Sequence, residues 1–200
     1  MDYTIEDFSK YKQYLNTISK VLDEYFEHQK EYICCKKGCG YCCERGSYPY
    51  SELEFRYLLL GFFKLEMKEQ QAVIKRIKEL KSEYEKSEDK ENFSHRCPFL
   101  NDENICSVYD FRGLICRVFG LITYHENGQY TIPFCQELGL NYSKVYDEKN
   151  KKIDTEKIKE YGYKNMPEVH RTNLKLLKSP EFFENEPIDF GEMKPLIEWL

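Results

Sequence analysis

The sequence predicts an α+β fold: a small, mainly helical domain with short β-hairpins around an irregular, cysteine-rich centre. Three observations lead to this prediction. Apolar residues recur every three or four positions over long stretches of the first half, which is the spacing of amphipathic helices. Shorter apolar stretches flank polar turns further along the chain, as the strands of hairpins do. Nine cysteines are divided between one dense cluster and one dispersed group.

Three helices are expected in the first half of the chain. Residues 7–31 and 66–87 each carry one apolar stripe, and their remaining faces are mostly charged. Between them, Ser51-Glu52-Leu53-Glu54 matches a capping box, so a helix should begin after Ser51 and end near Gly61. Residues 87–96 are polar without periodicity and are expected to form a loop.

Two hairpins are expected in the second half. The first joins residues 97–100 to residues 105–108 through a polar turn. The second joins residues 118–124 to residues 130–134 around Asn127-Gly128, a dipeptide that favours hairpin turns. Cys135 would then lie at the end of the second strand.

The segment after the hairpins should be polar and then helical. Residues 141–152 are again polar. Asp154 or Thr155 could cap a helix that runs through Tyr161 and ends at Gly162.

Length and composition fit one domain. Two hundred residues can build one hydrophobic core, so we expect a single domain over residues 1–200, with 35–135 as its cysteine-rich core and 1–34 and 136–200 as helical flanks. The net charge of −5, without a basic face, argues against binding of nucleic acid or membrane surfaces. The acidic N-terminus lacks a signal-peptide pattern, and the apolar run 57–63 is too short to span a bilayer. We therefore expect a cytoplasmic protein, in which disulfides are disfavoured.

Five cysteines lie within ten residues, Cys34-Cys35-Lys36-Lys37-Gly38-Cys39-Gly40-Tyr41-Cys42-Cys43. In a reducing compartment, thiols at this density usually bind a metal. The Cys39-x2-Cys42 spacing lets two sulfurs converge on one ion, and the two glycines give the loop backbone freedom. The second group is more widely spaced and consists of Cys97, Cys106, Cys116 and Cys135.

The type of metal site stays open at this point. Four thiolates satisfy tetrahedral zinc and equally satisfy an iron–sulfur cluster. Eight cysteines could build two four-sulfur sites, or one site and a structural remainder. The Cys35-x3-Cys39-x2-Cys42 spacing also occurs in radical S-adenosylmethionine enzymes, and Cys34-x4-Cys39-x2-Cys42 occurs in plant-type ferredoxins. Neither spacing is followed here by the strand pattern that those folds require.

Basic and aromatic residues flank the thiols. Those within four residues of a cysteine would lower thiol pKa values and offset the charge of a thiolate site; they are Lys36, Lys37, Arg45, Arg96, Arg112 and Arg117. Tyr109, Arg112 and Arg117 are the best candidates for contacting a cofactor, and binding of an anionic substrate is the alternative. His95 could replace a thiol as a ligand, although a solvent-facing loop histidine is the commoner case.

The two groups together resemble a known family. Cys97-Pro98-Phe99-Leu100, Cys106-Ser107-Val108-Tyr109 and Arg112-x3-Cys116-Arg117-Val118-Phe119 follow C-x3-C-x2-C-C. This combination is similar to the CxxCxxCC family of zinc- or iron-chelating domains, also called YkgJ-type cysteine-cluster proteins, over roughly residues 35–135. The resemblance implies metal ligands at Cys35, Cys39, Cys42, Cys43, Cys97, Cys106, Cys116 and Cys135. Cys34 is left over, as a reactive thiol or a bystander.

The sequence departs from the family pattern at two places. Three residues separate Cys35 from Cys39 where the family name has two, so Cys34 stays an alternative to Cys35. Gly113 stands where the family usually has proline, which should loosen that turn.

The resemblance implies a metal-binding protein, which together with the expected cytoplasmic setting predicts a cytoplasmic protein that holds an iron–sulfur cluster such as 4Fe-4S, zinc, or both. Some members are labelled iron–sulfur oxidoreductases, and a related motif occurs in flagellin lysine methylases, so a redox-active or modifying enzyme is one interpretation. The alternatives are a structural zinc module that binds a protein partner, and a metal-handling protein without catalysis. We favour iron–sulfur because eight thiols exceed what one structural zinc needs. The sequence identifies no catalytic residue.

Overall fold

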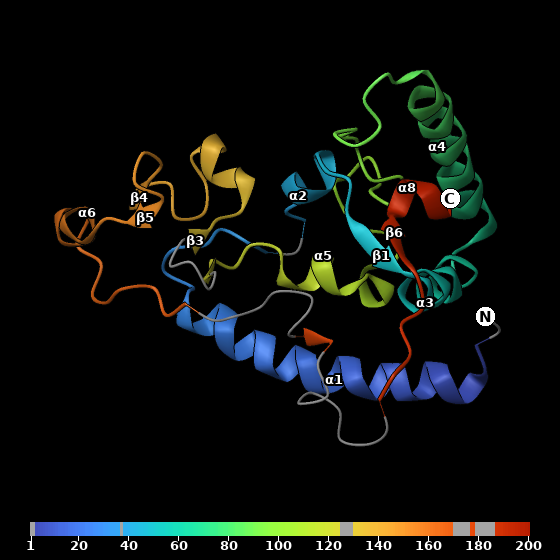
Figure 1. Cartoon of the computed structure of the whole chain (residues 1–200), viewed down its shortest axis with the longest axis horizontal. Helices are drawn as coiled ribbons and strands as arrows, with labels where there is room; N and C mark the ends of the chain where they lie inside the picture. Colours follow the sequence, from blue (N-terminus) through green and yellow to red (C-terminus); the bar gives the residue numbers. More distant parts are fainter. Residues whose placement is uncertain (1–2, 37, 125–129, 170–176, 179–186) are drawn as a thin grey trace. The chain divides into compact units, whose positions relative to one another are not determined.

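The computed structural model describes residues 3–36, 38–124, 130–169, 177–178 and 187–200. These residues form helices and three pairs of short antiparallel strands (Figure 1), which confirms the predicted α+β class. The chain divides into two compact units. The first unit consists of Met1–Lys10, Lys37–Arg117 and Ile188–Leu200, and the second of Tyr11–Lys36 and Val118–Pro187. That the whole chain is one domain stays a prediction.

The first helix is longer at its start than the apolar stripe indicates. Helix α1 spans Ile5–His28. Thr4 and Asp7 cap it reciprocally: Asp7 accepts from the Thr4 backbone N–H at 2.8 Å, and Asp7 N–H donates to the Thr4 hydroxyl at 3.2 Å. This exchange satisfies N–H groups that a helix start leaves unpaired, so the helix begins at Ile5.

The predicted capping box is confirmed. Helix α3 spans Glu52–Phe62, and α4 spans Met67–Lys86. The Ser51 hydroxyl accepts from the Glu54 N–H, and the Glu54 carboxylate accepts from the Ser51 N–H at 2.9 Å. Glu54 is only 1% exposed, so this carboxylate lies inside the protein.

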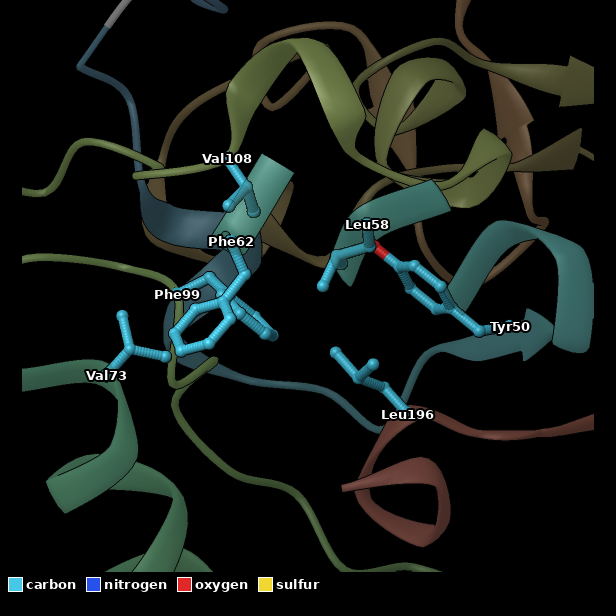
Figure 2. Packing of buried hydrophobic residues seen from close by; sticks show 7 residues of the cluster. All are labelled: Tyr50, Leu58, Phe62, Val73, Phe99, Val108 and Leu196. Carbon is cyan, nitrogen blue, oxygen red and sulfur yellow. The ribbon is translucent and has the colours of Figure 1, made fainter. Parts of the chain in front are cut away.

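The core of the first unit is built around one strand pair. Strand β1, Pro49–Ser51, pairs antiparallel with β6, Met193–Pro195, and helix α8, Leu196–Trp199, follows (Figure 1). The Trp199 indole N–H donates to the Tyr50 carbonyl at 2.9 Å and ties α8 to β1. Figure 2 shows the buried side chains of this core: Tyr50, Leu58, Phe62, Val73, Phe99, Val108 and Leu196.

The second unit contains the other two strand pairs. Strand β2, Thr123–Tyr124, pairs with β3, Tyr130–Thr131, so the two predicted strands do pair. The predicted Asn127-Gly128 turn lies outside the described residues. The first strand is shorter than expected: Val118 belongs to a helix, and Gly120 has a φ of +112°, which is not an extended conformation. The second strand is shorter because a 3-10 helix begins at Phe134. The 3-10 helix η2, Phe134–Leu138, contains Cys135.

A short hairpin, in whose strands only Ile153 is buried, begins within the polar segment 141–152. Strand β4, Tyr146–Asp147, pairs with β5, Lys152–Ile153. Tyr142 and Val145 are buried beside it, in a core that also contains Ile153. Helix α6, Thr155–Glu160, follows, and Asp154 is its cap, accepting from the N–H groups of Glu156 and Lys157.

No helix in the described ranges combines the length and the apolar character needed to span a membrane.

Candidate metal centre

Helix α2, Tyr41–Glu44, presents the vicinal thiols Cys42 and Cys43. The Gly40 carbonyl starts this turn by accepting from the Cys43 N–H at 2.8 Å. The sulfur atoms of Cys42 and Cys43 are 4.0 Å apart, and both side chains are half-buried. The first cysteine group therefore places two sulfurs side by side.

The second cysteine group is joined to the first through the backbone. The Cys97 N–H donates to the Cys43 carbonyl at 2.7 Å. Next to it, the Arg96 guanidinium forms an ion pair with Glu44. Gly40 permits close approach of the two segments, because a Cβ there would lie 3.1 Å from the Asn104 carbonyl oxygen.

The predicted first hairpin is present in minimal form. One antiparallel bridge joins Leu100 to Cys106, and Ser107 N–H donates to the Phe99 carbonyl at 2.9 Å. The Asn101 side chain closes the turn by accepting from the Ile105 N–H at 2.8 Å. This turn brings Cys97 and Cys106 back toward each other.

The last thiol of the first unit lies on a short helix. The 3-10 helix η1, Tyr109–Phe111, leads into α5, Leu114–Val118, which carries Cys116. Glu54 accepts from the Leu114 N–H at 2.8 Å and so holds the start of α5. The Gly113 N–H donates to the Tyr50 hydroxyl at 3.1 Å, so a hydrogen bond constrains the turn that was expected to be loose.

Five thiols from both groups gather in the first unit. Cys42 interacts electrostatically with each of the other four, which are Cys43, Cys97, Cys106 and Cys116. Three of them, Cys97, Cys106 and Cys116, also pack against the hydrophobic core. Among the described residues, no three His, Cys, Asp or Glu side chains already stand in a coordinating arrangement.

Burial sets the ionisation of these thiols. It raises the pKa of Cys116 to about 12 and raises that of Cys97 further. It also raises the pKa of Cys106. The hydrogen bond between the vicinal thiols lowers the pKa of Cys42 and raises that of Cys43. Without metal, Cys42 is therefore the thiol of this pair that ionises first.

Backbone and side-chain donors fit an anionic group at these sulfurs. Backbone hydrogen bonds from Phe99 to Cys97 and from Val108 to Cys106 oppose the burial effect and lower those pKa values. The Arg112 charge lowers the pKa of Cys42, Cys106 and Cys116. Donors and a cation of this kind stabilise thiolates bound to a metal.

Arg112 also has an unused donor. Its guanidinium lies 3.5 Å from the centroid of the Tyr109 ring and donates to the Tyr109 carbonyl at 3.0 Å. Its Nε atom is buried without a hydrogen-bond partner. A buried N–H beside thiols fits a sulfur anion as its missing acceptor. The residues present therefore fit a thiolate-bound metal or cluster.

The other two candidates differ from Arg112. Tyr109 is 50% exposed and serves as the surface on which the Arg112 guanidinium lies. The Arg117 guanidinium donates to the carbonyls of Arg112 and Asp110 and thereby braces the η1–α5 turn. A direct role of these residues at a cofactor stays a prediction.

The remaining predicted ligands are distributed over both units. Cys39 lies in the first unit and is half-buried, just before α2. Cys35 and Cys135 lie in the second unit, where both interact with the Tyr142 hydroxyl. The Asn141 amide donates to the Cys35 sulfur at 3.2 Å.

Asn141 forms hydrogen bonds with Cys34 as well as with Cys35. The Cys34 backbone N–H donates to the Asn141 side-chain oxygen at 2.7 Å, and the Cys34 side chain is exposed. Asn141 is itself buried and also donates to the Gly120 carbonyl at 3.1 Å. Asn141 therefore fixes the start of the dense cluster to the second unit.

The surroundings of His95 differ from those expected. His95 is 8% exposed and packs against Phe93, so the solvent-facing interpretation is wrong. Its Nδ1 lies 3.0 Å from the Arg96 carbonyl, and its Nε2 is buried without a partner. Lys36 and Arg45 are exposed, and Lys37 lies outside the described residues.

Sequence reasoning missed the polar residues that support the thiols. Tyr50 and Tyr48 each place a hydroxyl beside the cluster: Tyr50 contacts the Cys116 sulfur, and Tyr48 donates to the carbonyls of Cys42 and Arg45. The capping box marked Glu54 as the cap of one helix only. No local pattern could show that it also holds the start of a second helix.

Comparison with known proteins gave one match. A family model named CxxCxxCC and described as "Putative zinc- or iron-chelating domain" matches residues 34–153, a range that contains all nine cysteines. The resemblance found from the cysteine motifs is thereby confirmed, and the expected cofactor agrees with this description. No curated protein and no solved structure matches the chain.

Proposed function

The chain belongs to the CxxCxxCC family of zinc- or iron-chelating domains, and from this membership we propose that its cysteine thiolates hold an iron–sulfur cluster or zinc. The observation that supports this most directly is the gathering of five thiols in the first unit. They come from two segments that the Cys97–Cys43 hydrogen bond joins. The ligands would be drawn from Cys42, Cys43, Cys97, Cys106 and Cys116, together with Cys39.

An iron–sulfur cluster is the occupant that we favour. The number of thiols exceeds the four that a structural zinc takes, and the cationic Arg112 lowers the pKa of three of them. When bound, such a cluster supplies electron transfer. The protein would then be a cytoplasmic redox protein or a cluster-dependent modifying enzyme, in which Tyr109, Arg112 and Arg117 contact the cofactor.

Structural zinc is the second candidate, and the packing of the thiols supports it. Cys97, Cys106 and Cys116 lie against the hydrophobic core of the first unit. An ion held there would cross-link α2, the 97–106 segment and α5 through their thiols, and so contribute its binding energy to folding. In that case the protein would not be an enzyme. It would either present a folded surface to a protein partner or store and deliver metal ions.

Cys35 and Cys135 complete the proposed set of eight ligands. Both lie in the second unit and interact with Tyr142. We therefore include a second metal site, formed by these thiols, in the proposal. The number of metal ions bound per chain measures whether that site is filled. The proposal includes neither nucleic acid nor a membrane as partner.

The test is purification without oxygen, followed by measurement of iron, zinc and acid-labile sulfide. The favoured proposal predicts a brown protein with equal amounts of iron and sulfide. A colourless protein with stoichiometric zinc would contradict the iron–sulfur assignment and support the second candidate. A protein that retains neither metal would contradict both. Cys34→Ser is the matched control, because this exposed thiol lies outside the proposed set.

A further inference from the structure

The Tyr50 hydroxyl lies between a backbone N–H and a thiol. Tyr50 is 2% exposed, and its oxygen is 3.2 Å from the Cys116 sulfur. The Gly113 N–H donates to the same oxygen at 3.1 Å. Cys116 follows Gly113 on the same short segment, so the hydroxyl joins the turn and the thiol that it carries.

The arrangement of donors fixes the direction of the bond to sulfur in the metal-bound state. A tyrosine hydroxyl has one proton to donate. The Gly113 N–H can act only as a donor, so it occupies a lone pair of the oxygen. Among the described residues, the Cys116 sulfur is the one acceptor within reach of the hydroxyl proton. A metal-bound cysteine sulfur has lost its own proton, so Tyr50 must donate to it.

The surrounding structure holds the hydroxyl in this position. Tyr50 lies on β1 and is paired through the backbone with Lys194 of β6. The Trp199 indole binds its carbonyl. A Cβ on Gly113 would lie 2.8 Å from the Tyr50 ring atoms, so only glycine lets the turn come this close. The donor is therefore in place without rearrangement of the ring.

We propose that Tyr50 is a positioning residue that donates a hydrogen bond to the metal-bound sulfur of Cys116, and that Gly113 directs the hydroxyl proton to that sulfur. This inference rests on the proposed function, because it requires Cys116 to be a ligand. A hydrogen bond to a ligating sulfur stabilises its negative charge and reduces its electron donation to the metal. It thereby tunes metal affinity and, for a cluster, the reduction potential.

The experiment uses Co²⁺ as a spectroscopic probe, because its thiolate complexes show sulfur-to-metal charge-transfer absorption. The full chain is loaded anaerobically as wild type, as Tyr50→Phe and as Tyr14→Phe. Tyr14 is the matched control, since its buried hydroxyl donates to the Leu177 carbonyl at 2.6 Å in the second unit. We expect Tyr50→Phe to bind the same amount of Co²⁺ with an affinity roughly 10–100-fold lower. Its charge-transfer band should move to longer wavelength, and Tyr14→Phe should change neither property.

Cys116→Ser separates failure of this inference from failure of the proposed function. If Cys116→Ser loses Co²⁺ while Tyr50→Phe keeps the wild-type band and affinity, the inference is wrong and the metal centre stands. If Cys116→Ser keeps the full amount of Co²⁺ and its spectrum, Cys116 is no ligand and the inference fails, whereas a wild-type chain that binds no Co²⁺ would overturn the proposed function as well. Should Tyr50→Phe not fold, Gly113→Ala moves the intact hydroxyl instead. An unchanged band in that variant would equally overturn the inference.

Discussion

The backbone N–H of Cys97 donates a 2.7 Å hydrogen bond to the carbonyl oxygen of Cys43. These residues belong to different cysteine groups, separated in sequence by α3 and α4. Because the bond joins main chains, it sets the position of both segments regardless of thiol ionisation. The dense cluster is therefore one part of a larger thiol centre in the first unit.

Replacement of Glu54 should destabilise the first unit. Its carboxylate accepts from the N–H groups of Ser51 and Leu114, and a glutamine amide in its place would present a donor to one of them. Leaving a buried donor unsatisfied costs about 1–3 kcal/mol, so Glu54→Gln should lower the urea midpoint by a corresponding amount. Glu79→Gln, on the solvent side of α4, is the control and should change stability by less than about 0.5 kcal/mol. Equal midpoints for both variants would show that Glu54 does not hold α5.

Loss of the Arg112 charge should slow the reaction of the metal-free thiols. Arg112 lowers the pKa of Cys42, so Arg112→Gln should reduce its thiolate fraction at neutral pH. We expect the alkylation rate of Cys42 to decrease by about two- to tenfold, because the thiolate is the reactive form. Mass spectrometry of peptides after brief alkylation measures this rate. Arg56→Gln, at an exposed ion pair with Glu52, should leave it unchanged; an equal decrease in both variants would contradict a specific role of Arg112.

Metal-free protein should lose stability as the pH rises above about 9. Burial raises the pKa of Cys116 to about 12, whereas a cysteine in the unfolded chain has a pKa near 8.5. The folded state therefore binds this proton more tightly. Its contribution to stability is complete below about pH 8.5 and is lost progressively toward pH 12. Urea unfolding is measured at pH 7, 8.5 and 10 on protein from which a chelator has removed the metal. The urea midpoint should be the same at pH 7 and 8.5 and should decrease between pH 8.5 and 10.

Metal-loaded protein should show the opposite dependence. Ligating thiols are already deprotonated in the folded state, so acid competes with the metal and stability falls as the pH drops below neutral.

A metal-free protein whose midpoint rises between pH 8.5 and 10 would contradict the burial of Cys97 and Cys116.

Periodic and capped elements could be predicted from the sequence because their signals are local. Apolar spacing indicated α1 and α4, and the Ser51–Glu54 pair indicated α3. The pairing of the two segments could be expected from their cysteines, although no local signal specifies a bond between Cys43 and Cys97. The assignment of the individual cysteines as metal ligands rests on the family resemblance and stays a proposal.

Buried polar residues could not be predicted in the same way. Asn141 and Tyr142 belong to a polar segment, and its sequence gives no sign that either residue is buried. Both are buried, since Asn141 binds the backbone of Cys34 and Gly120, and Tyr142 binds Gln29. Tyr50 likewise gives no sequence signal for its contact with Cys116. Such contacts depend on tertiary structure rather than on residue spacing.

Metal content of single cysteine variants tests the two-segment centre most directly. Cys42→Ser, Cys106→Ser and Cys34→Ser are purified anaerobically, and metal per chain is measured together with far-ultraviolet circular dichroism. Cys106→Ser should lose as much metal as Cys42→Ser, because both thiols belong to the same centre. Cys34→Ser should retain the wild-type amount. If Cys106→Ser stays folded with full metal content while Cys42→Ser loses it, the dense cluster binds metal alone and the two-segment centre is wrong.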